Sequence, residues 1–196
     1  MMVTGFIQSI VLLTDASMIA RYSTDAFDAV GNACLMYVTL FMCMAGMADG
    51  SQIIIARRIG QQKTNLIGKV FGSSVWIQMA LATCLFLILH FFIPQWVANY
   101  SGQAQIAKLQ GIYIEQRSYA LFFAMFTLAI QAFFLAEGKS WVVLVTALIT
   151  AGSNAFLDYL LIFGNFGFSE LGIRGAALAS SISDGIGMLC MVGFLL

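Results

Sequence analysis

Three carboxylates interrupt long apolar stretches of this sequence: Asp15, Asp158 and Asp184. An ionisable side chain in hydrocarbon costs on the order of 3 kcal/mol on insertion scales, so each is a candidate functional residue. Asn154 precedes Asp158 by four residues, which on a helix places the amide and the carboxylate on one face, one turn apart. Amide, carboxylate and hydroxyl oxygens are hard ligands, so this face is suited to binding Na⁺ or a proton.

Each of these residues also has a purely structural interpretation. Small and amide side chains hold membrane helices together, and a hydroxyl such as that of Ser180, on one stripe with Asp184, is often used in the same way. Asp15 shares a face with Gln8, and near a helix end it would reach water beside Arg21. For Asp158 the cost of a membrane carboxylate favours function over packing.

The composition requires that these residues are positioned by membrane helices. Hydrophobic residues make up 61% of the 196 residues and charged residues 9%, too few polar side chains to cover a soluble domain. The net charge of zero gives no basic surface for nucleic acid. The 4 cysteines lie in apolar runs without a CxxC spacing, so we expect neither a disulfide nor a zinc site. We expect no cofactor and no metal apart from a coupling Na⁺.

Apolar stretches of about 20 residues predict membrane-spanning helices. The sequence therefore predicts an all-α, polytopic six-helix bundle forming one domain over residues 1–196. The first and last apolar stretches have no polar residues flanking them at the ends of the sequence, so we expect this chain to be a piece of a longer protein. The expected spans cover about 2–20, 30–55, 70–93, 118–136, 141–163 and 176–196. The long connection 94–117 is expected outside the spans, as a loop or as a short interfacial helix.

The distribution of basic residues predicts the orientation of the bundle. Arg57, Arg58, Lys63 and Lys69 crowd the second connection, and short cytoplasmic loops are enriched in Lys and Arg. We therefore expect this connection on the cytoplasmic side of an inner (plasma) membrane. With six spans, both ends of the chain would lie on that side too.

Three segments resemble the MATE (multidrug and toxic compound extrusion) family, part of the broader MOP flippase superfamily. NAFLDYLLIFGNFGFSELGIRGAALASSIS is similar to its fifth-to-sixth span region, LLTDASMIARYSTDAFDAVG to its first span, and GMADGSQIIIARRIGQ to the inner end of its second. The resemblance implies the first lobe of a two-lobe transporter, whose second six-helix lobe is missing here. It also implies a cation or proton site at Asp15, Asn154, Asp158 and Ser180, with Ser180 where relatives often have Thr. Asp184 and Gln8 remain secondary candidates.

The resemblance implies an antiporter that exports organic, often cationic and lipophilic, compounds in exchange for Na⁺ or H⁺, and not an enzyme. Such a protein has a small-molecule substrate and the lipid bilayer as partners, and no nucleic acid. A flippase for lipid-linked oligosaccharides is the alternative within the superfamily, favoured by a cavity lined with Arg or Lys, which the expected spans lack. An intramembrane aspartyl protease is the alternative from another class, but the Gly-x-Gly-Asp turn of such enzymes is absent from the sequence.

Overall fold

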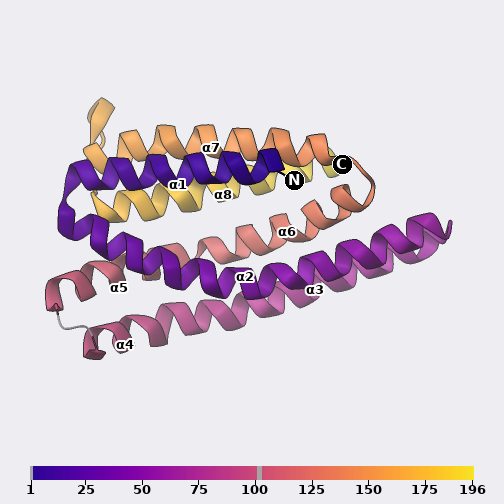
Figure 1. Ribbon diagram of the computed structural model, residues 1–196, viewed down its shortest axis with the longest axis horizontal. Helices are drawn as coiled ribbons and strands as arrows, with labels where there is room; N and C mark the ends of the chain where they lie inside the picture. Colours follow the sequence, from indigo (N-terminus) through magenta and orange to yellow (C-terminus); the bar gives the residue numbers. More distant parts are fainter. Residues whose placement is uncertain (1, 101–102) are drawn as a thin grey trace.

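The computed structural model describes residues 2–100 and 103–196, apart from the side chains of residues 2–5, 8, 43 and 100. The described chain is almost entirely helical, as expected. Its long helices run side by side as a bundle (Figure 1). The α-helices are α1 (Met2–Tyr22), α2 (Thr24–Gly60), α3 (Thr64–Leu87), α4 (Ile93–Tyr100), α5 (Ala104–Ser118), α6 (Ala120–Ala136), α7 (Ser140–Phe163) and α8 (Ile173–Leu195).

Several of these helices are long and apolar enough to cross a membrane. By length and composition, four stretches of the described residues qualify: α2, the continuous run Thr64–Asn99, α7 and α8. A fifth is possible if α5 and α6, which meet at a bend of 47°, form one broken span. The first expected span lies in α1, where several side chains are outside the described residues. The chain is thus a multi-pass membrane protein, and the count of six spans stays a prediction.

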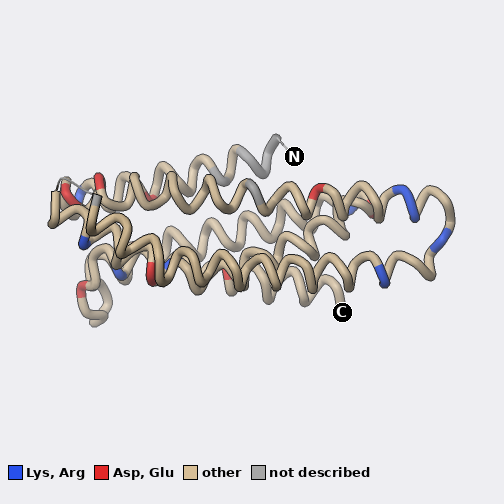
Figure 2. Tube along the Cα trace, turned by 90° about the horizontal axis from the view of Figure 1, so that it is seen from below, with Lys and Arg blue, Asp and Glu red and all other residues tan. Residues whose placement is uncertain are grey.

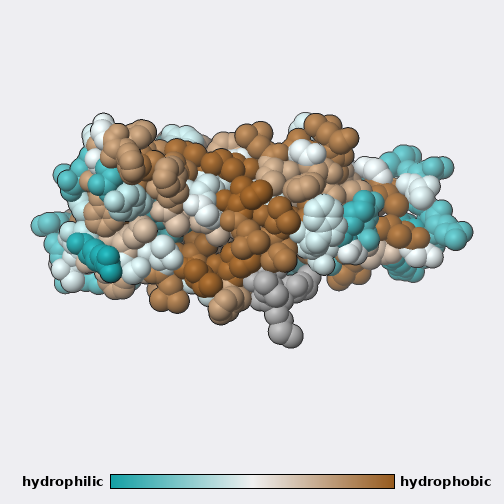
Figure 3. Space-filling model, turned by 90° about the horizontal axis from the view of Figure 1, so that it is seen from above, coloured by the Kyte–Doolittle hydropathy of each residue, from teal (hydrophilic) through white to brown (hydrophobic). Residues whose placement is uncertain are grey.

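The surface agrees with a membrane location. Brown, hydrophobic atoms form a broad band across the middle of the molecule, and hydrophilic atoms gather toward its two ends (Figure 3). Large apolar side chains such as Leu35, Ile53, Trp76 and Leu189 are exposed. In water such a surface would be unfavourable, whereas in a bilayer it faces lipid.

Two expected connections are helical. A single residue, Ser23, separates α1 from α2; its backbone is extended and its hydroxyl accepts from the amide of Ala26 at 3.5 Å. Residues 94–117, expected outside the spans as a loop or as a short interfacial helix, form most of α4 and of α5. One face of α5 is buried, because Ala107, Gly111 and Ile114 pack into the bundle. Tertiary packing therefore decides the conformation of this polar segment.

The basic connection between α2 and α3 lies at one tip of the bundle (Figure 2). Figure 1 shows the start of α1 and the end of α8 toward this same side. The two ends and the basic connection are therefore on one side, which agrees with the sequence. That this side is cytoplasmic remains a prediction.

Helices α7 and α8 form a tight antiparallel pair. At the end of α7, Gly164 adopts a left-handed conformation with a φ of 68°, and a Cβ there would meet the backbone of Glu170. In the first turn of α8, a Cβ on Gly175 would meet the carbonyl of Leu161. Farther along, a Cβ on Gly187 would meet the hydroxyl of Thr150. Glycines thus allow the two backbones to approach closely.

Candidate functional site

A large cavity lies between the helices. Its volume is about 1390 Å³, and residues of α1, α2, α5, α6, α7 and α8 line it. Apolar and aromatic residues form most of the wall, with a few polar side chains between them. The acidic and basic residues of the wall are Asp15, Asp28, Arg117 and Asp184.

Asp15 and Asp158 meet at the wall of this cavity. Asp15 extends from α1 and is half-buried, whereas Asp158 extends from α7 and is fully buried, with 0% exposure. Their carboxyl groups are close enough to interact with each other. As two carboxylates neither can donate, and Oδ1 of Asp15 and both oxygens of Asp158 have no hydrogen-bond donor among the described residues. A shared proton or a bound cation would satisfy these oxygens.

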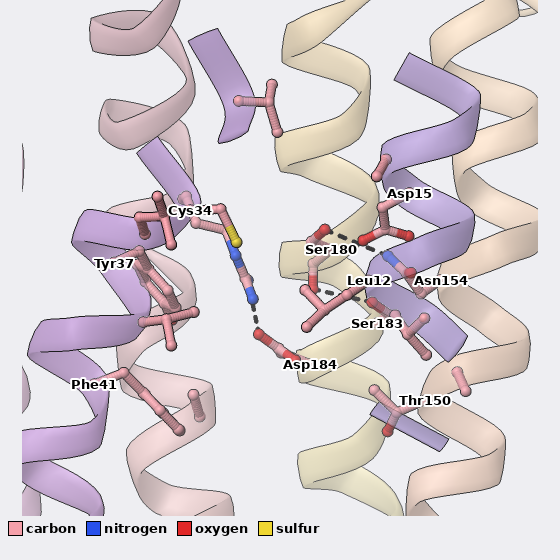
Figure 4. Close-up of a pocket in the computed structure, with 18 of the residues that line it drawn as sticks. Leu12, Asp15, Cys34, Tyr37, Phe41, Thr150, Asn154, Ser180, Ser183 and Asp184 are labelled. Atoms are coloured by element: carbon pink, nitrogen blue, oxygen red, sulfur yellow. Dashed lines mark hydrogen bonds and ion pairs between the residues drawn. The ribbon is translucent and has the colours of Figure 1, made fainter. Parts of the chain in front are cut away.

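Asn154 and Ser180 complete this group of oxygens. Asn154 lies one turn before Asp158 on α7, and its Nδ2 donates to Oγ of Ser180 on α8 at 3.3 Å. This bond turns the amide oxygen away from Ser180, and Oδ1 of Asn154 has no partner in the described part of the chain. Figure 4 shows Asp15, Asn154 and Ser180 together on one side of the cavity. We call Asp15, Asn154, Asp158 and Ser180 the carboxylate site.

The four residues of the carboxylate site come from three helices, and the structure places them side by side. That they bind a cation or a proton stays a prediction. Asp15 points toward Asp158 and the cavity, so the alternative in which it reaches water beside Arg21 does not describe this structure. Gln8, the secondary candidate on the same helix, has a side chain outside the described residues.

Asp184, the other secondary candidate, belongs to a different group. Its Oδ2 accepts from Nη1 of Arg117 at 2.7 Å, and both side chains are largely buried. The guanidinium lies over the ring of Tyr37, 4.8 Å from the centroid. The hydroxyl of Tyr37 is buried without a partner among the described residues. We call Tyr37, Arg117 and Asp184 the ion-pair site; Figure 4 shows Tyr37 and Asp184 reaching into the cavity from different helices.

Arg117 was not expected in the cavity, because the connection 94–117 was predicted to lie outside the spans. In the structure Arg117 is in the last turn of α5, directly before the break to α6. One signal was present: a carboxylate within a span needs a counter-charge, and Arg117 directly precedes an expected span. Arg117, which lies just outside the expected span 118–136, thus gives the cavity a basic residue, although the expected spans carry almost none.

His90 and Ser118 connect the break between α5 and α6 to a neighbouring helix. His90 lies in a short π-helix, Ile88–Phe92, and its Nδ1 is 3.2 Å from Oγ of Ser118. The Ser118 hydroxyl donates to the carbonyl of Glu115, so it accepts from His90, whose Nδ1 therefore carries the proton. His90 thus packs against the break between α5 and α6.

The described residues contain no group of three or more His, Cys, Asp or Glu side chains placed to hold a metal ion. Cys34, Cys84 and Cys190 are free thiols, and Cys43 lies outside the described side chains. A metal at the carboxylate site would therefore have oxygen ligands only, which suits Na⁺.

Comparison with known proteins relates this chain to transporters. It is 27% identical over 183 residues to the probable multidrug resistance protein NorM of Rhizobium meliloti, covering 93% of this chain and 39% of that protein. It is 25% identical over 169 residues to the probable multidrug resistance protein NorM of Listeria monocytogenes, covering 86% of this chain and 37% of that protein. The chain thus spans about two fifths of the length of the curated relatives it matches.

Solved structures share the fold. One is described as a MOP superfamily transporter from Pyrococcus furiosus whose binding pocket has reverse polarity; the TM-score is 0.91 at 20% identity, over 100% of this chain and 42% of that chain. Another is the outward-facing conformation of a multidrug resistance MATE family transporter. The TM-score is 0.91 at 20% identity, over 100% of this chain and 43% of that chain. The family model MatE matches residues 1–160. With this match over most of its length, the chain belongs to the MatE family of membrane transporters.

Proposed function

We propose that this chain is the cation-binding lobe of an antiporter that exports small organic compounds in exchange for Na⁺ or H⁺. The observation that carries the proposal is the carboxylate site. Two carboxylates from different helices face each other, and three of their four oxygens have no donor among the described residues. A buried charge without a partner is unfavourable, so such a site is stable only with a proton or a cation in it.

Asp158 provides the charge in this proposal, and its neighbours provide the remaining oxygens. Oδ1 of Asn154 points away from its bond to Ser180 and is free to coordinate. A proton would be shared between Asp15 and Asp158, whereas Na⁺ would bind between both carboxylates. Because Asp15 lines the cavity, a bound cation would reach it from there.

Transport requires that loading of this site is linked to a change in the cavity. In a secondary antiporter, cation and substrate favour different conformations, so each drives release of the other. We propose that a second lobe completes the cavity and that the molecule lies in the inner (plasma) membrane with both ends of this chain in the cytoplasm. The family relationship supports transport rather than catalysis, although two adjacent carboxylates alone would also suit an aspartyl protease.

A flippase for lipid-linked oligosaccharides is less well supported. A pyrophosphate-linked substrate needs several cationic groups, and Arg117 is the one basic residue among the described residues that line the cavity. The charge of Arg117 is already balanced by Asp184 at 2.7 Å.

The test is cation-driven dye efflux from proteoliposomes that contain this chain as the first lobe of a complete two-lobe transporter. An imposed Na⁺ or pH gradient shows which ion couples. Asp158→Asn keeps the shape of the side chain but removes the charge, so efflux should fall to that of empty liposomes. Asp49→Asn, at an exposed carboxylate on α2, is the matched control and should leave efflux unchanged. Undiminished coupled efflux in Asp158→Asn would refute the proposal.

A further inference from the structure

Four cations gather where α2 connects to α3. They are Arg57, Arg58, Lys63 and Lys69, which we call the basic tip. The sequence contains no Asp or Glu between Asp49 and Glu115, so no acid lies in this part of the chain. In the described part of the chain none of the four cations forms an ion pair, and Arg58 donates to the amide oxygen of Gln61 at 3.3 Å. The protein therefore leaves the charge of the basic tip unbalanced.

The turn between the two helices fixes the position of these cations. The backbone amides of Gln61 and Lys63 each donate at 3.1 Å to a carbonyl in the last turn of α2. Gln62 adopts a left-handed conformation with a φ of 57°, which helps the chain to reverse. Figures 1 and 2 show that α2 and α3 reach beyond the other helices here. The basic tip is thus an ordered surface that no other described helix covers.

The opposite end of the bundle has mixed charges instead. Its cations include Arg21 at the end of α1, Lys108 near the start of α5 and Arg174 at the start of α8 (Figure 1). Asp25 and Asp28 lie at the same end, in the first turns of α2. Figure 2 shows acidic and basic residues together at this end, whereas the charged residues drawn at the tip are all basic. An anionic partner is therefore attracted more strongly to the basic tip.

Exposed apolar side chains lie directly beside the basic tip. Ile53 on α2 is 69% exposed and lies one turn before Arg57, and Trp76 on α3 is 78% exposed and lies two turns after Lys69. Since a helix rises 5.4 Å per turn, the cations are within about 10 Å, along the helix axes, of side chains that face lipid. Figure 3 shows the same neighbourhood, with hydrophilic atoms at the right-hand end adjoining the apolar band. Long basic side chains at this depth reach the headgroup region.

We propose that the basic tip binds the headgroups of anionic phospholipids in the leaflet on its side of the membrane. The headgroup phosphate accepts from the guanidinium groups of the two arginines, and the two lysines add positive charge around it. The acyl chains lie against the exposed apolar side chains, which include Ile53 and Trp76. A cluster of four Lys and Arg directly beside a membrane span is the pattern that attracts anionic lipid.

A soluble acidic protein would also be attracted to four cations. The lipid fits better because Ile53 and Trp76 belong to stretches that are long and apolar enough to cross a membrane. Acyl chains are present at that depth, and a water-soluble partner is not. One phospholipid molecule satisfies both the charge of the tip and the apolar surface beside it.

The experiment measures which lipid surrounds Trp76. The chain has 3 tryptophans, so Trp96→Phe with Trp141→Phe leaves Trp76 as the one fluorescent reporter near the tip. The purified chain is reconstituted in phosphatidylcholine bilayers that contain phosphatidylglycerol or phosphatidylcholine with dibrominated acyl chains, and quenching gives the relative affinity of the two lipids. At low salt we expect phosphatidylglycerol to bind roughly fivefold more tightly. In about 1 M NaCl the preference should largely disappear, because salt screens exposed charges.

Two matched variants locate the preference. Each removes three mostly exposed cations and keeps Trp76 as the reporter, and thermal unfolding shows whether each is folded. The first neutralises three cations of the basic tip, by Arg57→Gln, Arg58→Gln and Lys69→Gln, and should lower the preference to about twofold or less. The control neutralises three cations at the opposite end, by Arg21→Gln, Lys108→Gln and Arg174→Gln, and should keep the preference. Because both leaflets have the same composition, the orientation of the chain in the bilayer does not affect the result.

A second reporter tests the position independently. Trp76→Phe with Trp141→Phe leaves Trp96, which is 50% exposed on α4 at the opposite end of the bundle (Figure 1). There we expect the two lipids to bind about equally, since the charges at that end are mixed.

Three results would overturn the inference. They are equal affinity of the two lipids at Trp76 in low salt, a preference that survives in the variant without the three tip cations, and an equally strong preference at Trp96. Equal affinity at Trp76 would assign the basic tip to a second lobe or to a soluble acidic protein instead. None of these results bears on the proposed antiport, because no ion gradient is imposed and Asp15 and Asp158 are intact.

Discussion

The cavity contains two groups of charged residues that differ in how their charges are compensated. In the ion-pair site, the protein itself supplies the counter-charge, since Arg117 donates to Asp184 at 2.7 Å. In the carboxylate site, two acids face each other and the amide oxygen of Asn154 has no partner among the described residues. One site is stable without a ligand, whereas the other needs a cation or a proton. This difference in charge compensation supports the proposal that the carboxylate site binds the coupling ion.

The strongest test of this contrast is the same substitution in both sites. In Na⁺-free buffer, Asp184→Asn should lower the free energy of unfolding by about 2 kcal/mol, because Arg117 is left largely buried without a counter-charge. Asp158→Asn should raise it by about 1 kcal/mol, since the new amide donates to Asp15 and the repulsion is lost. Thermal unfolding in detergent measures both. Destabilisation of equal size in the two variants would remove the distinction between the sites.

A second test isolates the attraction between the two members of the ion-pair site. Arg117→Gln should destabilise as Asp184→Asn does, but the double variant should recover about 1.5 kcal/mol relative to the sum of the two single changes. Chemical denaturation of all four proteins closes the cycle. A coupling energy near zero would mean that the short contact contributes nothing to stability.

A third test concerns the hydroxyl of the carboxylate site. Ser180→Ala removes the acceptor of the 3.3 Å bond from Asn154 and should cost about 1 kcal/mol, with a matching loss of cation affinity. Ser153→Ala is the matched control on α7, because the Ser153 hydroxyl donates only to carbonyls of its own helix. Comparison of thermal unfolding with and without Na⁺ reports both effects. Equal changes in the two variants would contradict a special role of Ser180.

The smallest expected effect is at Tyr37. Tyr37→Phe removes a buried hydroxyl that has no partner among the described residues and keeps the ring beneath Arg117, so stability should rise by about 0.5 kcal/mol. Thermal unfolding at several denaturant concentrations resolves a change of this size. A clear loss of stability would show that the hydroxyl is already hydrogen-bonded.

Two local rules single out Asn154 and Asp158 of the carboxylate site, whereas Asp15 and Ser180 were joined to them through the family resemblance. A charged residue in an apolar span is costly, and helical periodicity places Asn154 and Asp158 on one face. The ion-pair site was not predictable in the same way, because it depends on how the chain folds around Gly111 and Ile114. These residues are buried, so a polar segment becomes helix α5 and carries Arg117 into the bundle. Periodicity describes one helix at a time and contains no information about such packing.

The helix boundaries show the same limit. The expected span 30–55 is part of α2, which begins at Thr24 and ends at Gly60, because helical hydrogen bonding continues beyond the apolar core. The spans at 141–163 and 176–196 agree closely with α7 and α8. Hydropathy thus locates the apolar part of a helix, whereas capping residues such as Ser23 and Gly164 mark where the helices begin and end.

The close approach of α7 and α8 at Gly175 affects which ions the carboxylate site would distinguish. Because the two backbones are in contact there, Asn154, Asp158 and Ser180 are carried on one stiff hairpin, with their mutual spacing fixed. Among the four residues of the proposed site, Asp15 lies on a separate helix, α1. The size of the coordination shell therefore depends on the position of α1 relative to this hairpin. Discrimination between ions of different radius, such as Na⁺ and K⁺, would then be determined by how closely α1 can approach.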